Sequence, residues 1–104
     1  MRVWEEPLDQ TGDHTYQLDF TKEMTALGST LSTCTFAFST AAALVLEQHS
    51  NVLVLDVAFV KFRLQAGFEN TFTQKGKPLE IKVTYSSAAG DSDAFTVGLH
   101  IKNK

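Results

Sequence analysis

Residues 79–103 read LEIKVTYSSAAGDSDAFTVGLHIKN, and the fold class can be argued outward from these residues. Apolar and polar residues alternate on both sides of a turn of small residues, as in two half-buried strands. Gly90 lies in that turn and can adopt positive φ without steric cost. The pattern predicts a β-hairpin with one buried face, which must pack on a second sheet. The residues expected to face the core are Leu79, Ile81, Val83, Tyr85, Phe95, Val97, Leu99 and Ile101, whereas Thr96, Gly98, His100 and Lys102 are expected to face water.

The same alternation recurs upstream of the hairpin. Residues 15–20 and 29–39 alternate and are rich in β-branched and aromatic residues, so both predict strands. TKEMTALG between them has helical spacing and allows one turn of helix, with Gly28 as its stop. Residues 40–50, TAAALVLEQHS, contain good helix formers. Their strand neighbours and the alternation of Leu44, Leu46 and Gln48 nevertheless favour a strand after an Ala-rich turn.

The middle of the chain is apolar without a clear period. Residues 51–67, NVLVLDVAFVKFRLQAG, are apolar at both parities in their first half, which indicates one buried strand or two strands joined by a tight bend. Residues 68–78 are a polar loop or a short edge strand that carries Phe68 and Phe72. Six or seven short strands with a turn signal about every 8–12 residues are typical of an immunoglobulin-like sandwich. We therefore predict an all-β, antiparallel sandwich of about 6–8 strands.

Residues 1–14 are predicted to form an extended N-terminal arm, with one β-sandwich domain over residues 15–104. The arm is dense in polar and turn-forming residues and has no periodicity. Trp4 and Leu8 are its exceptions, because large apolar side chains in a free arm would lie in water. They either fold back on the domain or insert into a neighbouring protein.

Composition excludes several classes of protein. The chain has 104 residues and a formal charge of −3, without the basic stripe that nucleic-acid binding requires. Cys34 is the sole cysteine, so an intrachain disulfide and a multi-cysteine zinc site are excluded. The N-terminus lacks the apolar region of a signal peptide, and the apolar runs are shorter than the ~20 residues of a membrane helix. These features predict a soluble protein synthesised in a cytoplasm.

Catalytic and metal-binding patterns are not evident in the sequence. The three histidines, His14, His49 and His100, do not have the spacing of metal ligands. Cys34 shares its parity with two phenylalanines, which predicts a buried, unreactive thiol. Asp91 and Asp93 supply two oxygen ligands where calcium needs about six to eight. We therefore expect no enzymatic activity, metal or cofactor.

The chain resembles a family of small accessory virion proteins of tailed bacteriophages, of the head-decoration and fibre–tail adaptor type. The likeness covers residues 16–103, with phenylalanines where the family has tryptophans. Ala66 replaces one glycine of a glycine pair, and Asp91 replaces a basic residue of a turn. The matching segments are Asp19-Phe20, Leu27-Gly28, Leu31, Ser32-Thr33, Phe36, VKFRLQAG at 60–67, VTYSSAAGDSD at 83–93 and FTVGLHIKN at 95–103.

The resemblance implies an immunoglobulin-like fold and a structural role in the virion. It implies docking on a major capsid, tail or fibre protein, in multiple copies of a symmetric assembly, without nucleic acid or membrane as partner. The alternative is a carbohydrate- or host-surface-binding sandwich, which needs exposed aromatic residues beside polar groups. The candidate partner interface consists of Trp4, Pro7, Leu8, Phe68 and Phe72.

Overall fold

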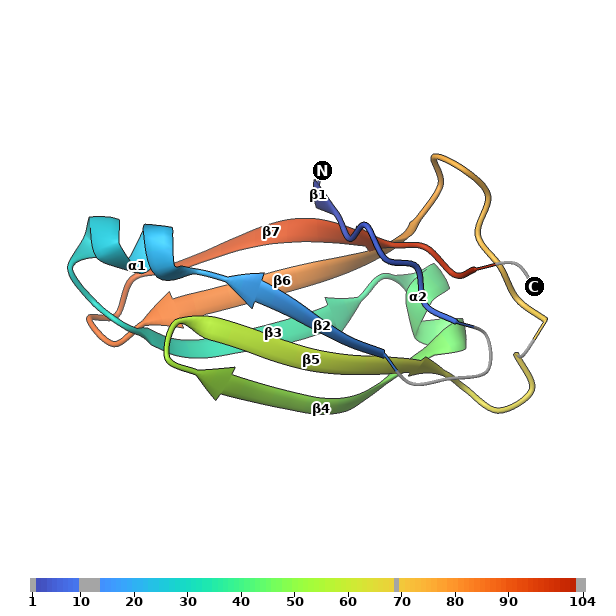
Figure 1. Cartoon of the computed structure of the whole chain (residues 1–104), viewed down its shortest axis with the longest axis horizontal. Helices are drawn as coiled ribbons and strands as arrows, with labels where there is room; N and C mark the ends of the chain where they lie inside the picture. The colour runs from blue at the N-terminus through green and yellow to red at the C-terminus, as the bar shows by residue number, and fades with distance from the viewer. Residues whose placement is uncertain (1, 10–13, 69, 103–104) are drawn as a thin grey trace.

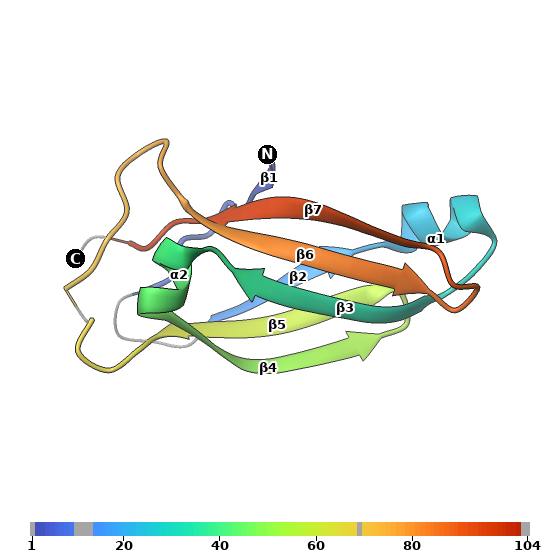
Figure 2. The same ribbon diagram turned by 180° about the vertical axis from the view of Figure 1, so that it is seen from behind.

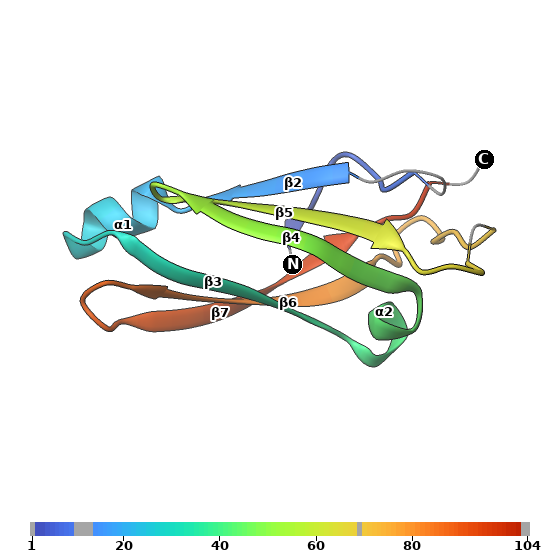
Figure 3. The same cartoon turned by 90° about the horizontal axis from the view of Figure 1, so that it is seen from below.

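The computed structural model of the chain describes residues 2–9, 14–68 and 70–102. It confirms the predicted all-β sandwich, in which two sheets pack face to face (Figures 1 and 3). One sheet has the order β1-β7-β6-β3 and the other the order β2-β5-β4. The elements are β1 (Arg2–Val3), β2 (His14–Asp19), α1 (Thr21–Leu27), β3 (Leu31–Phe38), α2 (Thr40–Val45), β4 (Leu46–Val54), β5 (Val57–Leu64), β6 (Leu79–Ser87) and β7 (Ser92–Leu99).

The strand distribution is that of an immunoglobulin-like fold. In a constant-type immunoglobulin domain, the second, fourth and fifth strands lie in one sheet, and the third, sixth and seventh lie in the other. Strands β2 to β7 follow this distribution, and every pair among them is antiparallel. The short β1 is the exception, because it pairs parallel to β7 instead of extending the sheet of β2.

The β6–β7 hairpin has the predicted turn and the predicted buried face. Leu79 pairs with Leu99, and Gly90 turns the chain with a φ of 100°. Gly98, however, is buried, so the prediction that it faces water is wrong. A Cβ at this position would lie 2.7 Å from Cγ of Pro78, because Pro78 and Val3 cover the strand here. Glycine is therefore required at this crossing by close packing.

The Ala-rich segment differs from its prediction. Residues 40–45 form the helix α2, where a turn was expected, and the expected strand begins at Leu46. The hydroxyl of Ser39 caps the helix by accepting a hydrogen bond from the backbone N–H of Ala42 at 3.2 Å. Good helix formers thus determine the structure of residues 40–45, and the helix ends where Leu46 is buried in the core. Figure 2 shows α2 linking β3 of one sheet to β4 of the other.

The helix expected before Gly28 is confirmed, and of the two alternatives for the apolar middle segment the structure shows the second. Helix α1 ends at Gly28, which adopts the left-handed conformation with φ 64°. The apolar middle segment consists of two strands with a tight bend, since β4 and β5 are joined by Leu55 and Asp56. Leu55 has a φ of 56°, a region that a bulky L-residue rarely adopts. Asp56 fixes the bend, because its carboxylate accepts a hydrogen bond from the backbone N–H of Leu31 at 2.9 Å.

The centre of the core is a cluster of aromatic rings around Phe62. This residue is fully buried on β5. Its ring lies 5.7–6.1 Å, centroid to centroid, from the rings of Trp4, Tyr16, Phe36 and Phe38. Rings from both sheets and from the N-terminal segment therefore meet at one residue, which makes these three parts one packing unit.

The N-terminal segment folds back on the domain. Leu8 is fully buried, its backbone N–H donates to the carbonyl of His100, and its own carbonyl accepts from Lys102 N–H, both at 2.8 Å. The indole N–H of Trp4 donates to the carbonyl of Gln17 at 3.3 Å. Of the two alternatives for these side chains, the structure thus shows docking on their own domain. The rest of the predicted arm before β2, residues 1 and 10–13, lies outside the described residues.

Candidate interaction surface

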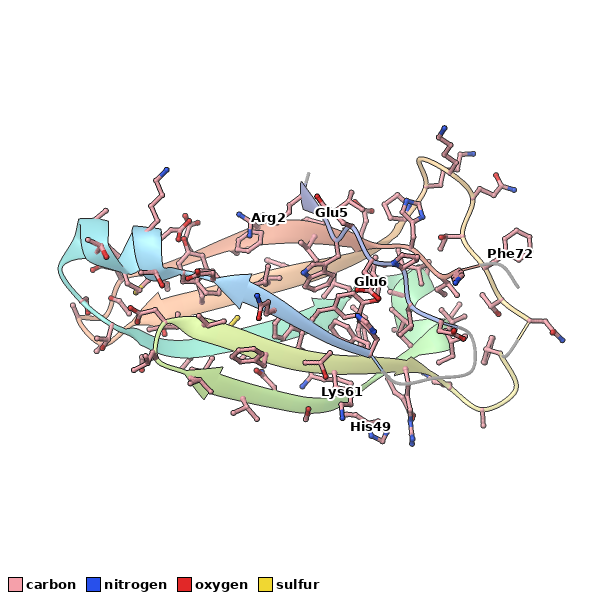
Figure 4. All side chains as sticks on the ribbon, in the orientation of Figure 1. Arg2, Glu5, Glu6, His49, Lys61 and Phe72 are labelled. Atoms are coloured by element: carbon pink, nitrogen blue, oxygen red, sulfur yellow. The ribbon has the colours of Figure 1, made fainter. Side chains whose placement is uncertain are left out.

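The structure distributes the five sequence-predicted interface residues over several environments. Leu8 belongs to the core and presents no surface to a partner, and Trp4 is half-buried in the aromatic cluster. Pro7 and Phe68 are also half-buried. Phe72 is 49% exposed and points away from the body of the protein on the loop between β5 and β6 (Figure 4). The five residues therefore do not form one contact surface.

A shallow hollow of about 360 Å³ lies where the N-terminal segment crosses the end of β7. Trp4 and Pro7 line it together with His100 and Thr73. The ring Nδ1 of His100 and the hydroxyl of Thr73 are 2.7 Å apart, and that hydroxyl also accepts from the backbone N–H of Ile101 at 2.9 Å. These hydrogen bonds hold Thr73, in the loop between β5 and β6, against the residues that follow β7. They therefore have a structural role and do not indicate a ligand site.

The candidate nucleophile lies in the core. Cys34 is buried, as predicted, and burial raises the pKa of its thiol to about 11. The neutral thiol is therefore its stable form at neutral pH. Among residues 2–9, 14–68 and 70–102, no group of three His, Cys, Asp or Glu side chains is placed to hold a metal ion.

A second hollow, of about 350 Å³, lies between α1 and the β6–β7 turn. Glu23, Asp91 and Asp93 line it beside Tyr85. Burial, followed by the charges of Asp93 and Glu23, raises the pKa of the Tyr85 hydroxyl. Asp93 accepts a hydrogen bond from the N–H of Ala94 at 2.8 Å, a contact between neighbouring residues of β7.

The outward side of the β2-β5-β4 sheet carries a group of apolar side chains. Val52 pairs with Phe59, and Val54 pairs with Val57. All four point away from the core, because their neighbours in β5, Ala58 and Val60, point into it. Val52 and Val54 are 52% and 53% exposed, and Val57 and Phe59 are half-buried. We call these four residues the β4–β5 face, and no helix lies over it in Figure 3.

The outward side of the other sheet has a different composition. Its cross-strand rows join Thr33 to Ser86, Thr35 to Thr84 and Ala37 to Lys82. The hydroxyls of Thr33 and Ser86 are hydrogen-bonded to each other. Polar residues on a solvent-facing sheet side are the ordinary arrangement. The valines and phenylalanine of the β4–β5 face therefore depart from what water alone would favour, as is typical of an interaction site.

Charged groups border the β4–β5 face at both ends. Asp19 on β2 lies in the row of Val57, and Lys61 lies four residues further along β5. Beyond Lys61, Arg63 donates a hydrogen bond to Glu47 and thereby lowers the pKa of that carboxyl, and His49 lies 3.3 Å from the same carboxyl. Figure 4 shows Lys61 and His49 pointing outward beside each other. The face is thus apolar in its centre and oppositely charged at its ends.

Sequence reasoning missed this face, although the apolar residues that form it are evident in the sequence. Residues 52–60 are apolar at both parities, which was interpreted as burial on both sides or as a bend. The bend exists, but on both strands every second side chain of this stretch still faces outward, and these side chains form the β4–β5 face. The outward side chains of β4 and β5 are apolar, and no further layer of the described structure covers them. This combination identifies a contact surface.

Comparison with known proteins adds no identification. No protein-family model and no curated protein matches the chain. The structure defines it as a β-sandwich protein with immunoglobulin-like strand distribution. None of the helices in the part of the chain that the structure describes is long and apolar enough to span a membrane.

Proposed function

We propose that this chain is a non-enzymatic structural protein that docks on other proteins through the β4–β5 face. The observation that carries the proposal is the contrast between the two sheets. One has an outward side of threonine, serine and charged residues, and the other has on its outward side the exposed Val52 and Val54 and the half-buried Val57 and Phe59. Apolar side chains that are left in water contribute little to folding, whereas burial against a partner stabilises a complex by about 25 cal/mol per Å² of apolar surface.

The assembly that we propose is the virion of a tailed bacteriophage. This part of the proposal is supported by the likeness of residues 16–103 to accessory virion proteins, and an immunoglobulin-like sandwich is the fold which that likeness implies. A small sandwich with a modest contact surface suits such a role, because repeated copies on a symmetric shell convert weak contacts into firm attachment. The partners would be capsid, tail or fibre proteins together with neighbouring copies of this chain in a symmetric assembly, and the protein would act in the virion.

The proposal is tested by titrating purified tailed-phage particles with the protein and measuring the bound fraction by co-sedimentation. We expect binding that saturates at a fixed number of copies per particle. A protein that ignores every particle but binds a glycan array would instead establish the carbohydrate-binding alternative, with Phe72 as the exposed aromatic residue available for a sugar ring. Binding to neither would contradict both proposals.

A further inference from the structure

We propose that the partner which covers the β4–β5 face is a second copy of this chain, packed face to face across a twofold axis. The inference rests on the proposed function, because it names the occupant of the same surface. The axis runs across the strands through the row of Gln17, Phe59 and Val52, so that the strands of the two copies run antiparallel. Aligned sheets pack about 10 Å apart in this way.

Charge complementarity supports this occupant. Asp19 and Lys61 lie two residues on either side of the Phe59 row, each about 7 Å from it along the strands. A twofold axis through that row places Lys61 of one copy over the row of Val57 in its partner. Asp19 is one strand away in that row, about 4.8 Å to the side and within reach of a lysine side chain. The arrangement forms two equivalent ion pairs around an apolar centre.

The charges themselves are free to make these pairs. Among the residues that the structure describes, Lys61 has no ion-pair partner within its own chain. Asp19 is exposed and accepts hydrogen bonds from the N–H and hydroxyl of Thr21, which hold one carboxylate oxygen at the start of α1. The same contacts lower the pKa of Asp19, so it is charged at neutral pH.

Face-to-face packing fits the structure better than pairing of the β4 edges. The ladder between β4 and β5 shifts register between Gln48 and Ser50, which leaves His49 in a bulge. A bulge interrupts the row of backbone groups that a new strand would need. The side chain of Asn51 reaches across to the carbonyl of Cys34 at 2.7 Å, so the edges of β4 and β3 are joined within one copy.

The expected dimer is weak. The sheet has three strands and is therefore only about 14 Å wide, which places the contact at the small end of specific interfaces. For a contact of this small class we expect weak, transient association, with a dissociation constant on the order of 10–100 μM. Such a dimer forms at high local concentration, as between neighbouring copies in an assembly.

The first test is sedimentation equilibrium of the full chain over a concentration range that brackets this constant. We expect a monomer–dimer equilibrium for the wild-type protein, weakened at least tenfold by Val52→Asp. Thr35→Asp is the matched control, because Thr35 occupies the equivalent outward position on an edge strand of the other sheet and should leave the equilibrium unchanged. A wild-type protein that stays monomeric up to millimolar concentration would overturn the inference.

The second test uses the two charges. Lys61→Asp and Asp19→Lys should each weaken the dimer at least tenfold, because each places two like-charged pairs in the interface. An equimolar mixture of the two variants should recover a heterodimer, since both pairs are then oppositely charged. Weak association of the mixture would exclude the proposed axis. If Asp19→Lys unfolds α1, Asp19→Asn keeps the oxygen that accepts from Thr21, and it should weaken the dimer several-fold without a change in melting temperature.

These results are distinguishable from a failure of the proposed function. A protein that remains monomeric, yet binds particles in a way that Val52→Asp abolishes, would refute the second copy and retain the docking surface. Dimerisation without particle binding would support the inference and contradict the virion role. Dimerisation that Val52→Asp does not weaken would place the contact elsewhere and overturn the inference.

Discussion

The substitution Leu8→Ala tests whether the N-terminal segment is part of the folded domain. Leu8 is fully buried, and its backbone is hydrogen-bonded on both sides to the end of the chain. Truncation of a buried leucine to alanine costs about 2–5 kcal/mol, because it removes apolar contact and leaves a cavity. For a loss of about 3 kcal/mol and a urea m-value of about 1.5 kcal/mol/M, the midpoint of unfolding should fall by about 2 M.

Urea unfolding followed by two probes gives the required measurement. Trp4 is the sole tryptophan of the chain and its ring lies 4.8 Å from that of Tyr16, so its fluorescence reports docking of the N-terminal segment. Far-ultraviolet circular dichroism reports the sheets. We expect coincident transitions by both probes, because the segment shares the aromatic cluster with both sheets. Glu5→Ala, an exposed position in the same segment, should shift the midpoint by less than about 0.3 M.

Two results would refute this reasoning. A cost of Leu8→Ala below about 0.5 kcal/mol would show that the side chain is not held in the core. A fluorescence transition at clearly lower urea than the dichroism transition would show that the segment detaches before the sandwich unfolds. Residues 2–9 would then again be available as an anchor for a neighbouring protein.

The remaining predictions concern the bend, the core and the thiol. Leu55→Asn should stabilise the protein by about 0.5–1 kcal/mol in urea unfolding, because Leu55 is 87% exposed in a left-handed conformation that asparagine tolerates. Leu44→Asn in helix α2 should instead cost about 0.5 kcal/mol, and equal effects would contradict the backbone argument. Phe62→Ala should lower the free energy of unfolding by about 3–5 kcal/mol, and Phe72→Ala should lower it by less than about 0.5 kcal/mol. Equal costs would show that Phe62 is not at the centre of the core. The raised pKa of Cys34, about 11 against an ordinary value of 9.0, means that the thiol ionises first in the unfolded chain, so stability should fall as the pH rises from 9 to 11. Cys34→Ala should show a smaller fall over the same pH range, and an identical pH profile would show that the thiol is not desolvated.

The hairpin and the layer structure could be predicted because local and tertiary preferences agree there. The apolar residues of β6 and β7 pack on a single layer, and Gly90 forms the turn between the strands. Periodicity alone therefore determines the strands and their buried face. The Ala-rich segment is different. Helix propensity determines the structure of residues 40–45, whereas from Leu46 onward burial in the core favours a strand. The local pattern contains no signal for where the helix ends and the strand begins.

The contact surface could not be predicted, for a related reason. Periodicity shows that one parity of a strand is apolar, but it does not show whether a layer covers that parity. Val52 and Phe59 became recognisable as outward-facing only when the sheet order placed β4 at an edge and β5 without a covering layer. The burial of Leu8 is equally non-local, since it depends on contact with Ile101 at the other end of the chain.

Particle binding of four proteins, compared in one co-sedimentation experiment, shows whether the protein acts through the β4–β5 face. These are the wild type, Val52→Asp, Thr35→Asp and Phe72→Ala. The account expects Val52→Asp to bind at least tenfold more weakly, with Thr35→Asp and Phe72→Ala close to the wild type. Unchanged binding of Val52→Asp, together with loss of binding by Thr35→Asp or Phe72→Ala, would contradict the account and place the contact on the opposite sheet or on the 65–78 loop.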